Sequence, residues 1–202
     1  RGRGLAVFAS TRVEPVYDKQ ALVDLVQEHA LEFGQFTLAS GKQASFYLDC
    51  RKVTLHSEGA RQVGEGILEL LGDPLPDAVG GMAIGADPIS AAVITTAAYQ
   101  GRPLRGFIVR KDSKEHGKGR MVEGPVEPGQ HVVIVEDVVT TGGSSLRAIE
   151  HVEAFGLHVD GVIAIIDRLE GGAEAFAERG YELRTLLTIA DLGARQVGEG
   201  IL

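Results

Sequence analysis

The chain has 202 residues, a length that suits one α/β domain with a substantial hydrophobic core. Its formal net charge of −8 argues against nucleic acid as the main partner, because a nucleic-acid surface needs a concentrated basic patch. Hydrophobic residues make up 44% of the chain, as in ordinary globular proteins, and no apolar run approaches the roughly 18 residues that would predict a membrane span.

The cysteine content indicates the cellular compartment, and the two ends of the chain set the bounds of the expected domain. Cys50 alone cannot form an intrachain disulfide, which favours the cytoplasm. The apolar stretch near the start is too short for a secretory signal, so residues 1–16 are interpreted as an extension without function. The nonapeptide ARQVGEGIL occurs at 60–68 and again at 194–202, which we interpret as a C-terminal tail. Residues 17–193 are then expected to form one domain.

The first half of the chain begins with a helix and a hairpin. Helical spacing of apolar residues starts after Asp18, a good capping residue, and Gly34 is expected to end this helix. Two strand-like runs between residues 36 and 51 flank Ser40-Gly41-Lys42, which predicts a β-hairpin. The further elements expected in this half are a helix over 57–72, a strand over 78–81 and a helix over 89–100.

The second half alternates short apolar runs with helical patterns. We expect strands over 104–109, 132–136, 159–166 and 183–189, and helices over 143–155 and 172–178. This alternation predicts an α/β fold: a central, mostly parallel sheet flanked by helices, with the hairpin as a small N-terminal hood. Ligands of such sheets gather beyond the carboxyl ends of the strands. The loops after Gly81, Val109, Val135 and Ile166 should therefore share one rim.

The stretch His131–Ser145, HVVIVEDVVTTGGSS, carries the strongest functional signal. A buried strand is followed by two acids, Glu136 and Asp137, and then by a turn rich in glycine and hydroxyl groups that opens a helix. Backbone N–H groups at a helix N-terminus bind phosphate. The acids would repel phosphate, so ribose hydroxyls or a hydrated metal ion are their natural ligands. An ordinary turn with Ser144 or Ser145 as helix cap explains the glycines but not two adjacent buried acids.

A basic segment follows the strand over 104–109. Residues 110–124, RKDSKEHGKGRMVEG, are too long and polar for a plain connector, although a solvated charged loop is the alternative. The bases begin at the expected rim, and several glycines supply flexible joints for a lid.

Three motifs together, RK-x-x-K-x-H, FTLASGK-x-x-x-FYLD and EDVVTTGGS, resemble the orotate phosphoribosyltransferases, which have the type I phosphoribosyltransferase fold. The resemblance covers about residues 18–192. It implies Mg²⁺-dependent transfer of a phosphoribosyl group from phosphoribosyl pyrophosphate to orotate, giving orotidine 5'-monophosphate and pyrophosphate in pyrimidine biosynthesis. It also implies a homodimer in which the basic loop reaches the neighbouring active site.

The resemblance assigns roles to individual positions. Glu136 and Asp137 match the acids that hold ribose hydroxyls, and Mg²⁺ is held mainly by the substrate, with water-mediated contacts to these acids. Lys114 matches the catalytic loop lysine. The positions that match the 5-phosphate loop are Val138, Val139, Thr140, Thr141, Gly142, Gly143 and Ser144. Those on the pyrophosphate side are Arg110, Lys111, Lys114 and His116, and those that contact orotate are Tyr47, Leu48, Thr140 and Arg168.

Arg168 suits a carboxylate because a guanidinium donates two parallel hydrogen bonds; a salt bridge with Asp167 or Glu170 is its alternative role. The chain departs from the family where Ala39 and Ile84-Gly85 replace residues that often carry a lysine. Two rival functions remain: a purine phosphoribosyltransferase of the adenine type, and a regulator that binds phosphoribosyl pyrophosphate without catalysis. Neither a nucleic acid nor a membrane is expected as a partner.

Overall fold

The computed structural model describes residues 17–37, 43–112 and 120–193. Its elements are α1 (Lys19–His29), β1 (Leu31–Thr37), β2 (Gln43–Leu48), α2 (Arg51–Thr54), α3 (Ser57–Leu71), β3 (Ala78–Met82), α4 (Ala86–Tyr99), β4 (Arg105–Val109), β5 (Val122–Glu123), β6 (His131–Val139), α5 (Gly143–Phe155), β7 (His158–Asp167), α6 (Gly172–Ala177), β8 (Leu183–Thr188) and the 3-10 helix η1 (Ile189–Leu192).

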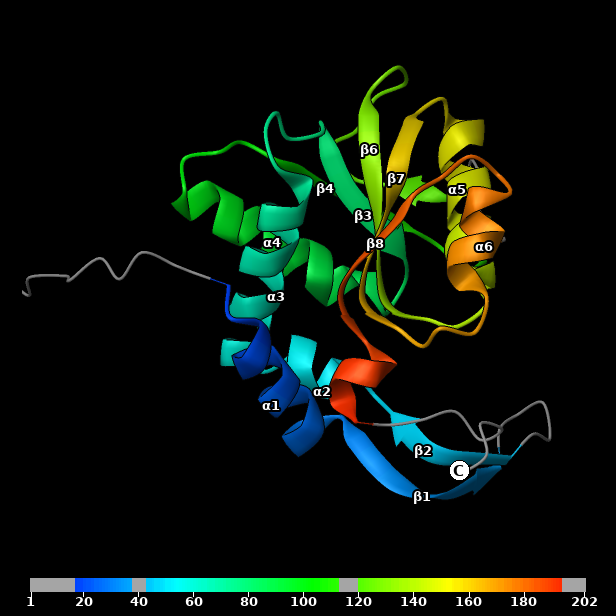
Figure 1. Ribbon diagram of the computed structural model, residues 1–202. Helices are drawn as coiled ribbons and strands as arrows, with labels where there is room; N and C mark the ends of the chain where they lie inside the picture. The colour runs from blue at the N-terminus through cyan, green and yellow to red at the C-terminus, as the bar shows by residue number, and fades with distance from the viewer. Residues whose placement is uncertain (1–16, 38–42, 113–119, 194–202) are drawn as a thin grey trace, which may run out of the picture.

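A six-stranded sheet in the order β5-β4-β3-β6-β7-β8 forms the centre of the protein, and its neighbours are parallel except for β4 and β5. Helices α3 and α4 cover one face and α5 and α6 cover the other (Figure 1). The β1–β2 hairpin, α1 and α2 form a smaller hood next to this body (Figure 1). The predicted α/β fold with a mostly parallel sheet and an N-terminal hairpin is confirmed.

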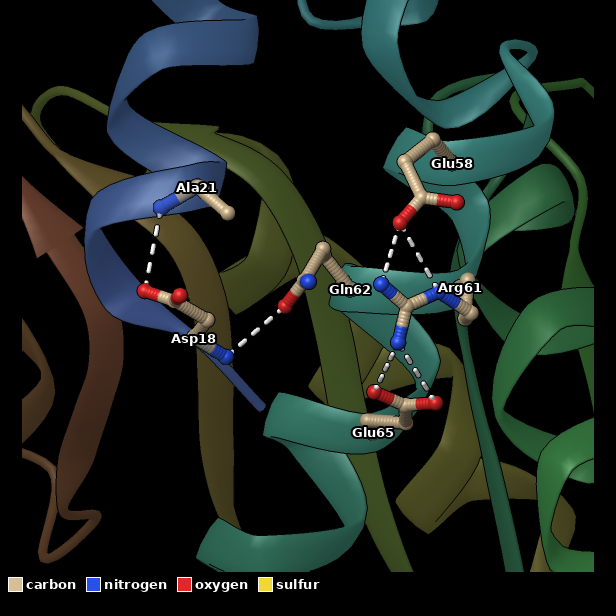
Figure 2. A network of polar contacts seen from close by, with 6 residues as sticks. All are labelled: Asp18, Ala21, Glu58, Arg61, Gln62 and Glu65. Carbon is tan, nitrogen blue, oxygen red and sulfur yellow. Dashed lines mark hydrogen bonds and ion pairs between the residues drawn. The ribbon is translucent and has the colours of Figure 1, made fainter. Parts of the chain in front are cut away.

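One of the connections between hood and body joins α1 to α3. Asp18 caps α1 by accepting the N–H groups of Gln20 and Ala21 at 2.9 and 3.1 Å, as its sequence position predicts. The Asp18 N–H in turn donates to Oε1 of the buried Gln62 at 2.9 Å (Figure 2). A single capping residue thus starts the first helix and fastens it to α3.

Several local predictions are wrong. Helix α1 ends at His29, and Gly34 lies inside β1, because the hydrogen bonds of the hairpin begin already at Leu31. The short elements α2 and η1 are too brief to show a periodicity, and β5 lies within the basic segment predicted as loop. Strand β6 continues beyond residue 136, since Val138 pairs with Ile166 of β7.

Among the described residues, no helix combines the length and the apolar character that crossing a bilayer requires. The turn 38–42, with Ala39 of the family motif, and the segments 1–16 and 194–202 lie outside the described residues, so their predicted roles stay predictions. The first copy of the repeated nonapeptide, residues 60–68, is part of α3.

Candidate active site

The two acids of β6 lie at its carboxyl end, inside the strand and not after it. Glu136 is buried, with 6% of its surface exposed, and Asp137 is half-buried. The Ser145 hydroxyl, from the first turn of α5, donates to Glu136 Oε2 at 2.8 Å. Asp137 Oδ1 accepts the backbone N–H of Val138 at 2.8 Å. Each carboxylate is therefore oriented by a partner from the chain itself.

Burial decides the protonation of Glu136. Desolvation, followed by the adjacent charge of Asp137, raises the pKa of Glu136 to about 7, although the hydrogen bond from Ser145 lowers it. Near neutral pH this carboxyl can accept hydrogen bonds as an anion or donate one as an acid. The ionised form is the stronger acceptor for the hydroxyl groups of a sugar, because hydrogen bonds to a charged oxygen are stronger than those to a neutral one.

The turn after β6 leads into the N-terminus of α5. Gly142 has a φ of 77°, in the left-handed region that glycine adopts without strain, and a Cβ at this position would lie 3.0 Å from Cζ of Phe176. The adjoining cavity has a volume of about 230 Å³ and is lined by Glu136, residues 138–145 and Arg147. With a water occupying about 30 Å³ of the liquid, a phosphate group and several waters have room there.

Val138 and Val139 belong to the strand and pair with Ile166 and Asp167 of β7. The Val139 side chain is almost completely buried. The part of the predicted phosphate loop that follows the strand is therefore Thr140–Ser144, a turn over Thr140–Gly142 and the first two residues of α5, and the two valines form the wall behind it. The helix dipole and the backbone N–H groups of α5 favour an anion at this turn.

The loop between β3 and α4 contacts the same acids. A Cβ on Gly85 would lie 3.2 Å from the carboxyl atoms of Asp137, so this loop touches the end of β6. Ile84 next to it is 66% exposed. In the first turn of α4, the half-buried Asp87 has a pKa raised by desolvation. The absence of a side chain at Gly85 therefore allows close approach of the loop to Asp137, and the position supplies no charge.

Comparison with known proteins agrees with this geometry. A family model described as "Phosphoribosyl transferase domain" matches residues 75–188. An orotate phosphoribosyltransferase of Rhodopirellula baltica is 57% identical over 182 residues, which cover 87% of this chain and 94% of that protein. The chain belongs to the orotate phosphoribosyltransferases.

Two solved structures are similar over nearly their whole length. The orotate phosphoribosyltransferase of Mycobacterium tuberculosis in complex with Fe(III) dicitrate has a TM-score of 0.79 at 40% identity, covering 87% of this chain and 99% of that one. The same enzyme in complex with 5-phospho-alpha-D-ribosyl 1-diphosphate gives a TM-score of 0.75 at 36% identity, with the same coverage.

Arg168, for which the sequence predicts a contact with orotate, follows β7 and donates its backbone N–H to Val139 O at 2.9 Å, next to Thr140. Its guanidinium lies 4.6 Å from the centre of the Phe46 ring and forms an ion pair with Glu170 at 2.8 Å. The alternative of a salt bridge with Glu170 is thus present in the structure. On β2, Tyr47 is 42% exposed and Leu48 packs against the core.

Arg110 and Lys111, which are predicted to contact pyrophosphate, follow β4, which lies two strands from β6, about 9–10 Å across the sheet. Arg110 donates its N–H to Met121 O at 2.8 Å, and its guanidinium lies 3.7 Å from Glu123. Lys111 is exposed. Lys114 and His116 lie outside the described residues, so their roles stay predictions.

Sequence reasoning missed three residues of this region: Ser145 as partner of Glu136, Phe46 as partner of Arg168, and Gly85 as neighbour of Asp137. A serine and a phenylalanine carry no signal of such contacts, since both fit a helix cap or a strand core. The replacement of the usual family residues by Ile84-Gly85 could have indicated that the loop approaches Asp137 closely at Gly85.

Proposed function

We propose that this chain transfers the 5-phosphoribosyl group of phosphoribosyl pyrophosphate to orotate, which gives orotidine 5'-monophosphate and pyrophosphate in pyrimidine biosynthesis. The observation that carries the proposal is the acid pair of β6: Glu136 lines a phosphate-sized cavity, and Arg168, which follows the neighbouring strand β7, donates its backbone N–H to Val139 at the end of β6. Membership of the orotate phosphoribosyltransferases supports the choice of substrates.

Glu136 and Asp137 bind the ribose hydroxyls, and the turn Thr140–Ser144 binds the 5-phosphate. The buried strand holds the acids still, and the α5 N-terminus points its N–H groups toward the cavity. This arrangement keeps the sugar in place while the bond at its anomeric carbon breaks. Val138 and Val139 support the turn from behind.

The departing pyrophosphate gains negative charge as the ribose becomes positive. Arg110, Lys111, Lys114 and His116 stabilise that charge, and Lys114 acts closest to the bond that breaks. The β3–α4 loop contributes backbone N–H groups. When the basic segment closes, it excludes water, which would otherwise hydrolyse the ribosyl cation.

Orotate binds between the hood and the rim. Arg168 holds its carboxylate through two hydrogen bonds, and Thr140 contacts the base from the turn. Tyr47 and Leu48 of β2 line the base. Leu48 packs against the core and Tyr47 lies 5.8 Å from the Phe36 ring, which supports a preformed wall.

The donor set at the rim fits a Mg²⁺ ion that is held mainly by substrate oxygens and reached through water by Glu136 and Asp137. Within the described ranges, no group of three or more His, Cys, Asp or Glu side chains could hold a metal ion by itself. Bound Mg²⁺ supplies positive charge to the pyrophosphate.

We further propose that the protein is a homodimer and that the partner subunit sits on the groove between α3 and α4. This groove of about 1090 Å³ is larger than the phosphate cavity and mostly apolar, and it includes Leu55 and Tyr99, which are 75% and 88% exposed. Arg61, held by Glu58 and by Glu65 at 2.9 Å, adds charge to one wall (Figure 2).

Its position supports the assignment to a second copy. Helix α4 forms one wall of the groove and begins beside Asp137, so a partner seated there lies next to this active site. The net charge of −8 supports small molecules as substrates, with no nucleic acid or membrane partner. The single cysteine, Cys50, supports the cytoplasm as location. Residues 17–193 act as a single catalytic domain.

The test is turnover of orotate. Purified protein with Mg²⁺ and phosphoribosyl pyrophosphate is expected to consume orotate, seen as falling orotate absorbance, and chelation of Mg²⁺ should stop the reaction. Adenine, tested in parallel, should not react. Turnover of adenine without orotate would favour the purine enzyme, and binding of phosphoribosyl pyrophosphate without any turnover would favour a regulator.

A further inference from the structure

A contact between the hood and the rim stands out because it joins two parts of the molecule that are far apart in sequence. The Phe46 ring of β2 lies 4.6 Å from the Arg168 guanidinium carbon, in a cation–π arrangement. Phe46 is 3% exposed and belongs to the main core cluster, so its ring is held from behind. The Arg168 side chain is 16% exposed. The pair is therefore largely shielded from water, which strengthens the attraction.

The geometry points to Phe46 as a positioning residue: we propose that its ring orients the Arg168 guanidinium for the orotate carboxylate. This inference rests on the proposed function. A guanidinium is planar and carries five N–H donors along its edges. The Phe46 ring attracts the guanidinium through its charge, so this contact does not compete with an oxygen ligand of Arg168. An arginine held in this way has less rotational freedom, which lowers the cost of binding a ligand.

The neighbouring ion pair completes the arrangement. Glu170, three residues after Asp167 on the same connection, contacts Arg168 Nη2 at 2.8 Å, so its carboxylate directs one edge of the guanidinium while the Phe46 ring attracts the charge. The two contacts come from different layers, β2 of the hood and the connection after β7. An isolated two-stranded hairpin is marginally stable. The Phe46 contact thus also ties the wall that carries Tyr47 and Leu48 to the residue that binds the carboxylate.

The experiment compares orotate kinetics of Phe46→Leu with those of Phe33→Leu. Phe33 is the cross-strand neighbour of Phe46 on β1 and is 68% exposed, so it controls for a general effect on the hairpin. Phe46→Leu is expected to raise KM for orotate about 3- to 30-fold, the range of a shielded cation–π contact, with kcat and KM for phosphoribosyl pyrophosphate within about twofold. Phe33→Leu should change none of them, and Phe46→Tyr, which keeps the ring, should stay close to wild type.

A double-mutant cycle separates positioning from simple packing. If Phe46 acts through Arg168, Phe46→Leu should leave kcat/KM for orotate unchanged in an Arg168→Gln background. An equal loss in both backgrounds, an unchanged KM in Phe46→Leu, or a Phe46→Tyr variant as weak as Phe46→Leu would each overturn the inference. If Phe46→Leu does not fold, as judged by thermal unfolding, Phe46→Met takes its place under the same criteria.

Wild-type turnover of orotate is measured first and tests the proposed function separately. With turnover present, a failed Phe46 comparison removes only the positioning role. Without any turnover of orotate by the wild type, both the function and the inference that rests on it are overturned.

Discussion

The Ser145 hydroxyl lies 2.8 Å from Glu136 Oε2 and donates a hydrogen bond to it, with both residues buried. This bond favours the ionised carboxylate, whereas desolvation and the charge of Asp137 favour its protonation. Ser145→Ala should therefore raise the pKa of Glu136 further above about 7. We expect the acidic limb of the pH profile of kcat/KM for phosphoribosyl pyrophosphate to move to higher pH, measured with orotate saturating.

Ser90→Ala is the matched control for this variant. Ser90 is also a buried serine near the start of a helix, and its hydroxyl makes no hydrogen bond within the described part of the chain. Its removal should leave the acidic limb in place. An acidic limb that is the same in Ser145→Ala and in wild type would show that Ser145 does not tune Glu136.

Glu136 should also make stability depend on pH. Its pKa is raised in the folded state from an ordinary 4.5 to about 7, so between these values the folded protein binds more protons than the unfolded chain. Through this group, the free energy of unfolding therefore falls as pH rises from about 4.5 to about 7. Glu136→Gln removes this contribution. Measured by urea unfolding, the free energy of unfolding should decrease less between pH 5 and pH 7.5 in Glu136→Gln than in wild type. An equal decrease in the two proteins would contradict the raised pKa.

Much of the fold could be predicted because its signals are local. Helical spacing that ends at Gly72 and Gly156 marked α3 and α5, and Gly142-Gly143 after the acids marked the turn into α5. The prediction placed the end of β6 too early because Glu136 and Asp137 read as a break in an apolar run. Their strand pairing depends on β7, a distant segment that local patterns do not encode.

The partners of the site residues could not be predicted for the same reason. The contact of Phe46 with Arg168 joins residues that are 122 positions apart in the sequence. The contact of Gly85 with Asp137 joins the loop after β3 to the end of the neighbouring strand β6. The Gly85–Asp137 contact follows from the order of the central sheet, in which β3 and β6 are neighbours, whereas the Phe46–Arg168 contact depends on how the separate β1–β2 sheet packs against that body.

Gly142 should be sensitive to substitution for two separate reasons. Its φ of 77° strains any other residue, and an added Cβ would press on the Phe176 ring. Gly142→Ala is expected to lower the free energy of unfolding by about 1–3 kcal/mol and to raise KM for phosphoribosyl pyrophosphate. Gly180→Ala is the control, because Gly180 has a φ of 85° and nothing near its Cβ position. In urea unfolding, Gly180→Ala should lose only the free energy that the backbone strain costs, and its KM should be unchanged. An equal loss of unfolding free energy in both variants would show that the Cβ at position 142 does not press on Phe176.

The α3–α4 groove can be tested by placing a charge in it. Tyr99→Glu puts a carboxylate into an apolar groove that we assign to the partner subunit, and burial of an unpaired charge is costly. We expect the dimer to dissociate, measured by light scattering coupled to size-exclusion chromatography. Phe33→Glu, an exposed aromatic on the hood outside this groove, should leave the assembly unchanged. A Tyr99→Glu variant that stays dimeric would place the interface elsewhere.

Sharing of the basic segment between subunits can be tested by complementation. Lys114→Ala removes the proposed loop cation and Asp137→Asn removes one acid of the pair, and each variant alone should lose about 100-fold or more in kcat. When the two variants are co-expressed in equal amounts, about half of the dimers contain one subunit of each variant. If Lys114 serves the neighbouring site, one of the two active sites in such a hybrid dimer has both residues intact. Co-expression should then restore about a quarter of wild-type activity. Lys118→Ala, in the same segment, serves as the control and should be active alone. If each loop served its own subunit, every site in a hybrid would lack one residue, and co-expression would restore nothing.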